Sequence, residues 1–502
     1  MQAEARSEGR GARGEKVGLV LGVLLLGFAL GTALTTPSWE IVITAVGWMA
    51  EVGAILLDPL LGLLLWIVIS PYAPFIHLNL DLGRGIPSLS LDRLAAGVLC
   101  VVLLAQVARR SRRLAPFTPL DGAIIAFSLP LVLSTRASLQ GVFSALQLMF
   151  DTYFIPFLVY YLARNLVRDR RALGGLFVSL GIIASYLIFL TVREQVTGQG
   201  LFVIEGRVAS YGANLTRVNS LLQNPAYIAL ALNLVLPFAL RAALCAGDTR
   251  ERWAYGLACV LLVGTVISLY NRAGWLSAVL VLLLSACYYP RLRRWLLVAL
   301  LVLALVSALF WNTVRESALF SERLTSEPSV DYRLRAARAV LQLVAPQPLW
   351  GVGFNNFASL SLSRELITKH TPNWWLPTPH NSYLDVLLAA GLLGLLPFLA
   401  IFAAILWESG RLYRRAASDP GVDRSLIVAL WGAFLAFVVS IATFDIVAAP
   451  FCALVFYLIV GAILGSQSQY ITICSCRTAK SGRKAVDPSL FRTGVAVHRE
   501  PS

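Results

Sequence analysis

Residues 383–407 read YLDVLLAAGLLGLLPFLAIFAAILW, a run in which Asp385 is the one charged side chain. Such a run is long enough to cross the roughly 30 Å of hydrocarbon in a bilayer as an α-helix. Similar apolar runs recur along the chain, whose 502 residues are 58% hydrophobic and only 14% charged. Ordinary soluble domains do not have this composition. The sequence therefore predicts an all-α, polytopic helical integral membrane protein, because a helix satisfies its own backbone groups inside lipid.

The lengths of these runs predict about 12–14 transmembrane helices. The apolar pattern places them at 17–35, 41–57, 59–75, 93–108, 120–134, 143–163, 173–192, 225–243, 254–270, 274–289, 296–312, 383–407, 426–444 and 446–466. We expect one membrane domain, residues 17–466, between a cytoplasmic tail at 1–16 and a polar, disordered cytoplasmic tail at 467–502. Its largest polar interruption, 313–382, is expected to be an external loop containing amphipathic helices.

The orientation follows from Lys and Arg, which collect in the short cytoplasmic loops of membrane proteins. Four Arg lie in 109–113, four in 164–171, three in 291–294 and four in 411–424, all on one side of the alternation. That side is predicted to be the cytoplasm, so the net charge of +15 mainly reports topology. These charges are scattered between spans without a nucleic-acid motif, and we expect no nucleic-acid partner.

Helical periodicity marks one segment of the external loop, from Asp331 to Val344. Leu334, Ala337 and Leu341 share a stripe with Val344, while the arginines of the segment lie elsewhere around the helix. This pattern predicts an amphipathic helix on the membrane surface, with the leucine-bearing stripe as its apolar face.

Three external arginines run against the positive-inside trend: Arg217, Arg272 and Arg333. Arg272 lies between two apolar runs, where an unpaired guanidinium at mid-depth would cost about 2.5–3.5 kcal/mol. Singly, Arg272 is equally well explained as an interfacial charge, and Arg217 and Arg333 are better explained as solvated charges. Together at one membrane face they would suit a polyanion, because a guanidinium donates paired hydrogen bonds to phosphate.

His380 precedes Asn381 and the apolar run at 383–407. A helix N-terminus and nearby arginines both disfavour an imidazolium ion, which leaves a neutral nitrogen able to accept a proton. This describes a general base. In the alternative interpretation, the free N–H groups of the same helix N-terminus bind an anion and His380 is only a hydrogen-bond donor. Both roles are compatible with the sequence.

Several common catalytic motifs are missing from the sequence: a Walker loop, HExxH, a nucleophile elbow and a clustered Cys/His metal set. We expect no cofactor and no metal ion. Gly351-Val352-Gly353 lacks the third glycine of a dinucleotide loop and is interpreted as a turn. Gly391 and Gly394 are expected to allow close helix packing.

These residues resemble the bacterial O-antigen ligase and polymerase superfamily. The most specific element is His380-Asn381, nine further residues and Gly391-Leu392-Leu393-Gly394, which is similar to the ligase signature of His, a small polar residue, nine spacers and GxxG. Three more elements agree in order and side: Asn271-Arg272-Ala273-Gly274-Trp275, Arg333 followed by Pro348-Leu349-Trp350-Gly351-Val352-Gly353, and Arg217 before Asn224-Pro225. The family more often has Ser at the position of Asn271 and Gly at that of Ala273.

The resemblance implies a multi-pass glycosyltransferase of the bacterial inner membrane whose active site faces the periplasm or exterior. Its donor would be a polyprenyl (undecaprenyl) diphosphate-linked glycan, and its acceptor a glycan, a lipid or a protein. Ligase, polymerase and protein O-oligosaccharyltransferase all remain open. His380 and Arg272 are the expected catalytic residues, and Arg217, Arg333 and Asn381 the expected substrate-binding residues. Preorganised arginines would stabilise the diphosphate leaving group without a metal.

The main alternative is a lipid-linked oligosaccharide flippase or another polytopic transporter. Such a protein needs charges within its spans, and Glu51 is the clearest mid-span charge here. The other notable charges gather at the outer rim, which favours an externally facing enzyme. An inactive scaffold would leave the grouping of His380 with the arginines unexplained.

The predicted orientation has a direct test in intact cells. A cysteine introduced at Ser363 should react with a membrane-impermeant thiol reagent, and a cysteine at Ser481 should be protected, because positive loops stay inside. Protection at 363 together with labelling at 481 would invert the topology and remove the external site.

Overall fold

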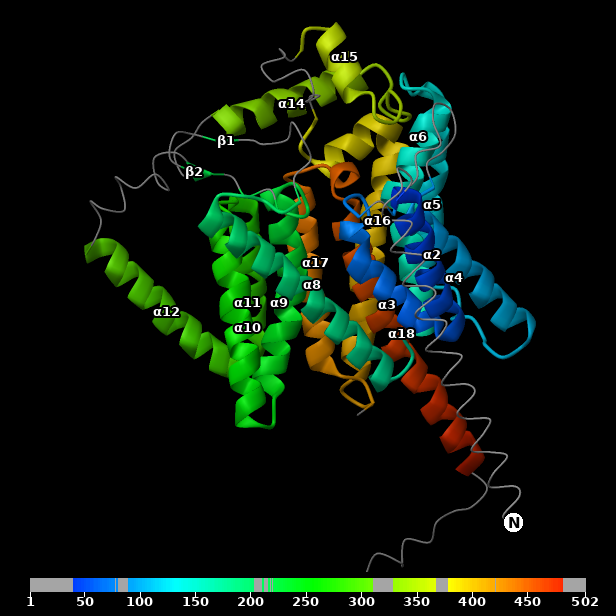
Figure 1. Ribbon diagram of the computed structural model, residues 1–502, viewed down its shortest axis with the longest axis vertical. Helices are drawn as coiled ribbons and strands as arrows, with labels where there is room; N and C mark the ends of the chain where they lie inside the picture. The colour runs from blue at the N-terminus through cyan, green and yellow to red at the C-terminus, as the bar shows by residue number, and fades with distance from the viewer. Residues whose placement is uncertain are drawn as a thin grey trace, which may run out of the picture.

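The structure, a computed structural model, describes residues 39–76, 78–79, 89–202, 210–211, 215–216, 218, 220–309, 328–366, 378–419 and 421–481. The predicted first span at 17–35 and the predicted ligand Arg217 lie outside these residues. The fold is described below for the remaining chain (Figure 1).

The described chain consists of helices and one short antiparallel ladder of two strands. The elements are α2 (Trp39–Leu57), α3 (Pro59–Ile69), η1 (Ser70–Tyr72), α4 (Leu91–Ala108), α5 (Pro119–Ser134), η2 (Thr135–Ala137), α6 (Val142–Met149), η3 (Phe150–Phe154), α7 (Ile155–Leu166), α8 (Arg170–Thr197), β1 (Ser210–Tyr211), β2 (Leu215–Thr216), α9 (Pro225–Cys245), α10 (Thr249–Ser268), α11 (Arg272–Tyr288), α12 (Pro290–Leu309), α14 (Pro328–Val344), α15 (Phe357–Ser363), α16 (Ser382–Arg415), α17 (Arg424–Ile441), η5 (Ile446–Ala448) and α18 (Pro450–Ser481).

The predicted fold class is confirmed: the chain is an all-α, multi-pass membrane protein. Nine helices of the described part are long and apolar enough to cross a membrane, and shorter apolar helices lie at 41–57, 59–72 and 272–288. The helices follow the predicted spans closely, as α9 and α17 illustrate. The helix that contains the last predicted span, α18, continues to Ser481, beyond the predicted end at 466.

Helix α18 forms the centre of the bundle, since 94% of its segment Pro450–Gln467 is buried inside the protein. It packs against α7 at very close range. A Cβ atom at Gly461 or Gly465 would overlap the backbone of Tyr160 or Arg164. Small residues therefore set the distance between these two helices, as is usual inside membranes, where close packing replaces the hydrophobic effect between spans.

Helix α14 lies across one end of the bundle, together with α15 (Figure 1). The sequence predicts this helix correctly, and the two leucines of its predicted apolar stripe face away from the protein core, as a stripe that lies against the membrane surface would. Leu334 and Leu341 are 54% and 57% exposed. The residues that pack inward are Ala336, Ala339, Val340 and Leu343, which form a small second core with Phe357 and Leu388. Both stripes are apolar, and the one with alanines packs because small side chains allow closer approach.

An interrupted helix, α16, organises this end of the molecule. Gly391 has φ +62° and ψ −156°, so the helix is broken there into an outer segment, 382–390, and a longer inner segment, 392–415. The expectation that Gly391 serves helix packing is therefore wrong. Its missing side chain instead makes room for the backbone of Leu349 and Trp350, which a Cβ atom would overlap. The conformation and the contact both require glycine.

The broken turn is closed by the segment 347–353, the connection between α14 and α15. Four backbone hydrogen bonds of 2.7–3.1 Å join them: Val352 N–H to Leu388 O, Gly353 N–H to Ala389 O, Leu392 N–H to Pro348 O, and Leu393 N–H to Leu349 O. These bonds satisfy the peptide groups that the break releases, which would otherwise be costly to bury. We call this arrangement the 347–353/Gly391 interlock.

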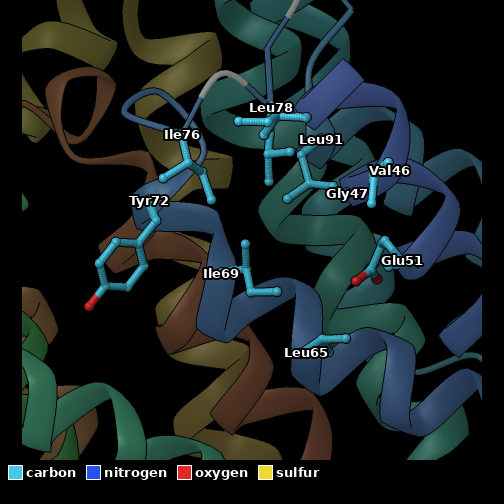
Figure 2. Close-up of a pocket in the computed structure, with 11 residues that line it drawn as sticks. Val46, Gly47, Glu51, Leu65, Ile69, Tyr72, Ile76, Leu78 and Leu91 are labelled. Carbon is cyan, nitrogen blue, oxygen red and sulfur yellow. The ribbon is translucent and has the colours of Figure 1, made fainter. Parts of the chain in front are cut away.

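A cavity of about 370 Å³ lies between α2, α3 and the start of α4. Figure 2 shows the Glu51 carboxyl pointing into this space, among the side chains of Leu65, Ile69 and Leu91. Glu51 is 2% exposed, and neither of its oxygens has a hydrogen-bond partner within the described residues. The sequence therefore identifies the mid-span charge correctly, and its surroundings are almost wholly apolar.

The interlock predicts a strong difference between two glycines of α16. Gly391→Ala should lower the free energy of unfolding by about 1–3 kcal/mol, through a disfavoured φ and overlap with the backbone of Leu349. Gly410→Ala is the matched control, because a Cβ atom there meets nothing within 4 Å. It should be neutral or stabilise by up to about 1 kcal/mol. Thermal unfolding of the purified proteins in detergent measures both, and equal melting temperatures would contradict the interlock.

Candidate functional site

The site lies where the start of α16 meets the loop between α17 and α18. The carboxylate of Asp445, in that loop, accepts hydrogen bonds from the backbone N–H groups of His380 at 3.2 Å and Asn381 at 3.0 Å. Asp445 is buried, with 6% of its surface exposed. A carboxylate held by two N–H groups is a rigid anchor, so the backbone that carries the imidazole has a fixed position.

The backbone of His380 has φ +50°, a left-handed conformation that is uncommon for a residue with a side chain. Two contacts orient its ring. Nδ1 lies 3.2 Å from the Thr378 hydroxyl, and the ring of Tyr332 packs edge-on with its centroid 5.5 Å away. The Tyr332 hydroxyl in turn donates to the Thr378 carbonyl at 3.0 Å. Backbone strain held by surrounding contacts is common at functional sites.

Asn381 caps the N-terminus of α16. Its side-chain oxygen accepts the N–H groups of Tyr383 at 2.9 Å and Leu384 at 3.2 Å, and its carbonyl accepts that of Asp385. The first-turn donors that an anion would need are therefore occupied within the protein. This arrangement disfavours the alternative in which the helix N-terminus binds an anion. The substrate-binding role of Asn381 stays a prediction.

A second residue of α16, Ser382, fastens the same loop. Its hydroxyl donates to the carbonyl of Phe444 at 2.8 Å and accepts the N–H of Ile446 at 2.8 Å. Ser382 has no exposed surface. The loop around Asp445 and the start of α16 thus form one hydrogen-bonded unit, although more than sixty residues separate them in the chain.

Arg333 and Arg272 approach this unit from two other helices. Arg333 lies on α14, and its Nη2 donates to the carbonyl of Thr443 at 3.3 Å. Burial lowers the pKa of Arg333, the positive charge of Arg272 lowers it further, and Asp445 opposes both effects. The two guanidinium groups and the carboxylate are therefore close enough to act on one another electrostatically.

Arg272 is the first residue of α11, and its place is set by the polar groups around that helix start. The Asn271 side chain accepts the N–H of Gly274 at 2.6 Å. From α9, the fully buried Asn233 donates to the Gly274 carbonyl at 2.9 Å and to the Ser277 hydroxyl at 2.7 Å. Gly274 also lacks room for a Cβ atom against Ala229 of α9. Close packing thus fixes the helix end that carries Arg272.

The residue that the sequence analysis missed is Asp445. It stands between two apolar runs, as Arg272 does, and that position was its one sequence signal. Burial raises the pKa of the Asp445 carboxyl, while the charge of His380 and the N–H groups that it accepts lower it. The acid and the imidazole are thus electrostatic neighbours. Within the described part of the chain, no group of three or more His, Cys, Asp or Glu side chains is arranged to hold a metal ion.

Comparison with known families gives the decisive observation. The family model described as O-antigen ligase matches residues 257–399. Over this segment the chain is similar to the O-antigen ligase superfamily. The matched O-antigen ligase segment contains α11 with Arg272, α14 with Arg333, the interlock and the start of α16 with His380.

This match confirms the resemblance to the O-antigen ligase superfamily that the sequence motifs indicate, and Arg217 and Asp445 lie outside the matched segment. No curated protein matches the chain. The match supports a membrane function in which glycans are ligated or polymerised, of the glycosyltransferase type. Such a function involves lipid-linked glycans and acceptors in general.

Asp445 should be a positioning residue for His380. Asp445→Ala removes both acceptors for the N–H groups of His380 and Asn381, so transfer activity should fall by at least about tenfold. Asp445→Asn keeps one oxygen as an acceptor, so its transfer activity should fall less. Loss of the negative charge also favours the neutral imidazole, so the acid limb of the pH–activity profile should move to lower pH.

The matched control for Asp445 is Asp331→Asn, which removes an exposed acid paired with Arg335 on α14. It should leave both the rate and the pH profile unchanged. An Asp445→Asn variant with the wild-type rate and profile would exclude the positioning role.

Proposed function

We propose that this protein transfers a glycan from a polyprenyl (undecaprenyl) diphosphate donor to an acceptor hydroxyl on the non-cytoplasmic face of the bacterial inner membrane. The acceptor is a glycan, a lipid or a protein side chain. One observation carries the proposal: in the O-antigen ligase segment, an oriented histidine lies near two arginines at one end of the bundle.

In the proposed reaction, the imidazole of His380 removes the proton of the acceptor hydroxyl. The hydroxyl oxygen then attacks the anomeric carbon of the donor, and the bond from that carbon to the diphosphate oxygen breaks. Polyprenyl diphosphate leaves with the electron pair. The contacts of His380 with Thr378, Tyr332 and Asp445 support this role, because a base acts only when held within hydrogen-bond reach of its proton.

The proposed task of Arg272 and Arg333 is to bind the diphosphate and to stabilise the charge that it gains as it leaves. Two neighbouring cations suit a dianionic ligand, because each guanidinium can donate paired hydrogen bonds to phosphate oxygens. Guanidinium groups supply this stabilisation without a metal ion, so the proposed reaction is metal-independent. Arg217 is proposed as a third ligand from the sequence alone.

The transporter alternative finds little support in the cavity beside Glu51. Apart from Glu51 and Tyr72, its lining residues are apolar: Ile43, Val46, Gly47, Ala50, Leu65, Ile69, Ile76, Leu78 and Leu91. A route for a glycan would need hydrogen-bonding groups along its length. The charges that distinguish this chain lie instead at the end of the bundle near α14, which favours the enzyme.

The central prediction concerns variants that separate chemistry from binding. In a deletion strain, wild-type protein should restore the surface glycan, and His380→Ala should not, while the lipid-linked donor accumulates. Purified His380→Ala should still bind donor, because a base acts in the chemical step and contributes about 10²–10⁴ in rate. Arg272→Ala should weaken both binding and transfer. Arg272→Lys should lower transfer activity by at least about tenfold, since an ammonium lacks the planar pair of donors.

Arg338→Ala, an exposed arginine of α14, is the control for charge and expression and should retain activity. Full activity of His380→Ala would eliminate His380 as the base. The purified protein should also keep its activity in excess chelator. Activity that is lost in chelator and restored by a divalent ion would overturn the metal-independent reaction but not the glycan transfer itself.

A further inference from the structure

A pair of arginines lies at the opposite end of the bundle from His380. Arg112 is in the loop between α4 and α5, at the lower right of Figure 1, and Arg168 is in the turn between α7 and α8. Each reaches across to the other segment. Arg112 Nη1 donates to the Asn165 carbonyl at 2.6 Å, and Arg168 Nη2 donates to the Arg113 carbonyl. The two guanidinium groups are therefore neighbours held by the backbone.

Their like charges are not neutralised within the described part of the chain, where neither arginine forms an ion pair. Burial lowers the pKa of both side chains, and the charge of Arg112 lowers that of Arg168 further. The Nε of Arg168 is buried without a hydrogen-bond partner. The neighbouring carboxylates, Asp58 and Asp169, cap helices α3 and α8. The pair thus keeps guanidinium donors that no described group accepts.

The surroundings place this pair at the surface of the bilayer. The two segments that carry it connect the ends of candidate membrane spans. Between Arg112 and α5, Phe117 is 71% exposed and Leu114 is 38% exposed. Exposed apolar side chains beside cations are typical of a segment that lies among lipid headgroups, where phosphate is the concentrated anion.

We propose that the phosphate group of an anionic phospholipid binds between Arg112 and Arg168. Planar guanidinium groups match phosphate oxygens with paired donors. The acyl chains of the same lipid lie against Phe117 and Leu114. This site is independent of the proposed glycan transfer, which takes place at the other end of the bundle.

The test uses the purified full-length protein in detergent, with short-chain phosphatidylglycerol, phosphatidylcholine of the same chain length, and inorganic phosphate as probes. Phosphatidylglycerol should raise the melting temperature in a saturable manner, and phosphatidylcholine should not. The apparent Kd for phosphatidylglycerol should rise by at least about tenfold in Arg112→Gln/Arg168→Gln, as expected for lost charged hydrogen bonds. The control Arg109→Gln/Arg170→Gln removes the same charge from exposed positions of the same two segments. It should bind phosphatidylglycerol like the wild type.

Three outcomes would overturn the proposal: equal stabilisation by the two lipids, unchanged binding in the Arg112/Arg168 variant, or arginine-dependent stabilisation by inorganic phosphate alone. The last would assign the pair to a soluble anion.

Since the variant removes contacts to Asn165 and Arg113, cross-linking of the wild type provides a second measurement. Photoreactive phosphatidylglycerol in lipid nanodiscs should label 109–118 and 165–171 and be displaced by unlabelled phosphatidylglycerol. Labelling confined to other segments would refute the site.

Discussion

The backbone pairing between the segment 347–353 and the break at Gly391 is the constraint on which the proposed active site depends. A helix that stops inside a packed protein leaves peptide groups that must find partners. Here the partners come from the connection between α14 and α15, through four hydrogen bonds. The same pairing draws α14 onto the outer segment of α16, where Val340 and Leu388 share a small core. Arg333 and His380 are brought to one place because the helices that carry them are joined in this way.

A second constraint is the sharing of one buried acid among several groups. Asp445 accepts two N–H groups at the start of α16 and lies in the electrostatic field of His380 and Arg333. A buried carboxylate without such partners would be costly. With them it holds the backbone of His380 in place. The backbone of the site is thus rigid.

The spans were predictable because a membrane helix must be apolar for about twenty residues, a local property that one sequence displays. The charges of the loops likewise predicted that Arg272 and His380 lie on the same side of the membrane. The contacts inside the site did not follow, because they join segments far apart in the chain. Asp445 had no neighbouring acid or histidine to mark it, and Gly391 has the same sequence signal whether it packs or breaks a helix. The second apolar face of α14, which packs against Phe357 and Leu388, was not predicted because its partners lie outside the helix itself.

The interruption of α16 has a geometric consequence for evolution in this part of the chain. As one straight helix, the 34 residues of α16 would extend about 51 Å, well beyond the roughly 30 Å of a bilayer core. Gly391 divides α16 into the longer inner segment and the short outer segment, and His380 lies just before the outer segment. Each residue added to or removed from the outer segment turns the imidazole by about 100° around the helix axis and shifts it by about 1.5 Å. The number of residues between His380 and Gly391 is therefore constrained by the position that the imidazole must take. An insertion between them should displace the imidazole more than a substitution would.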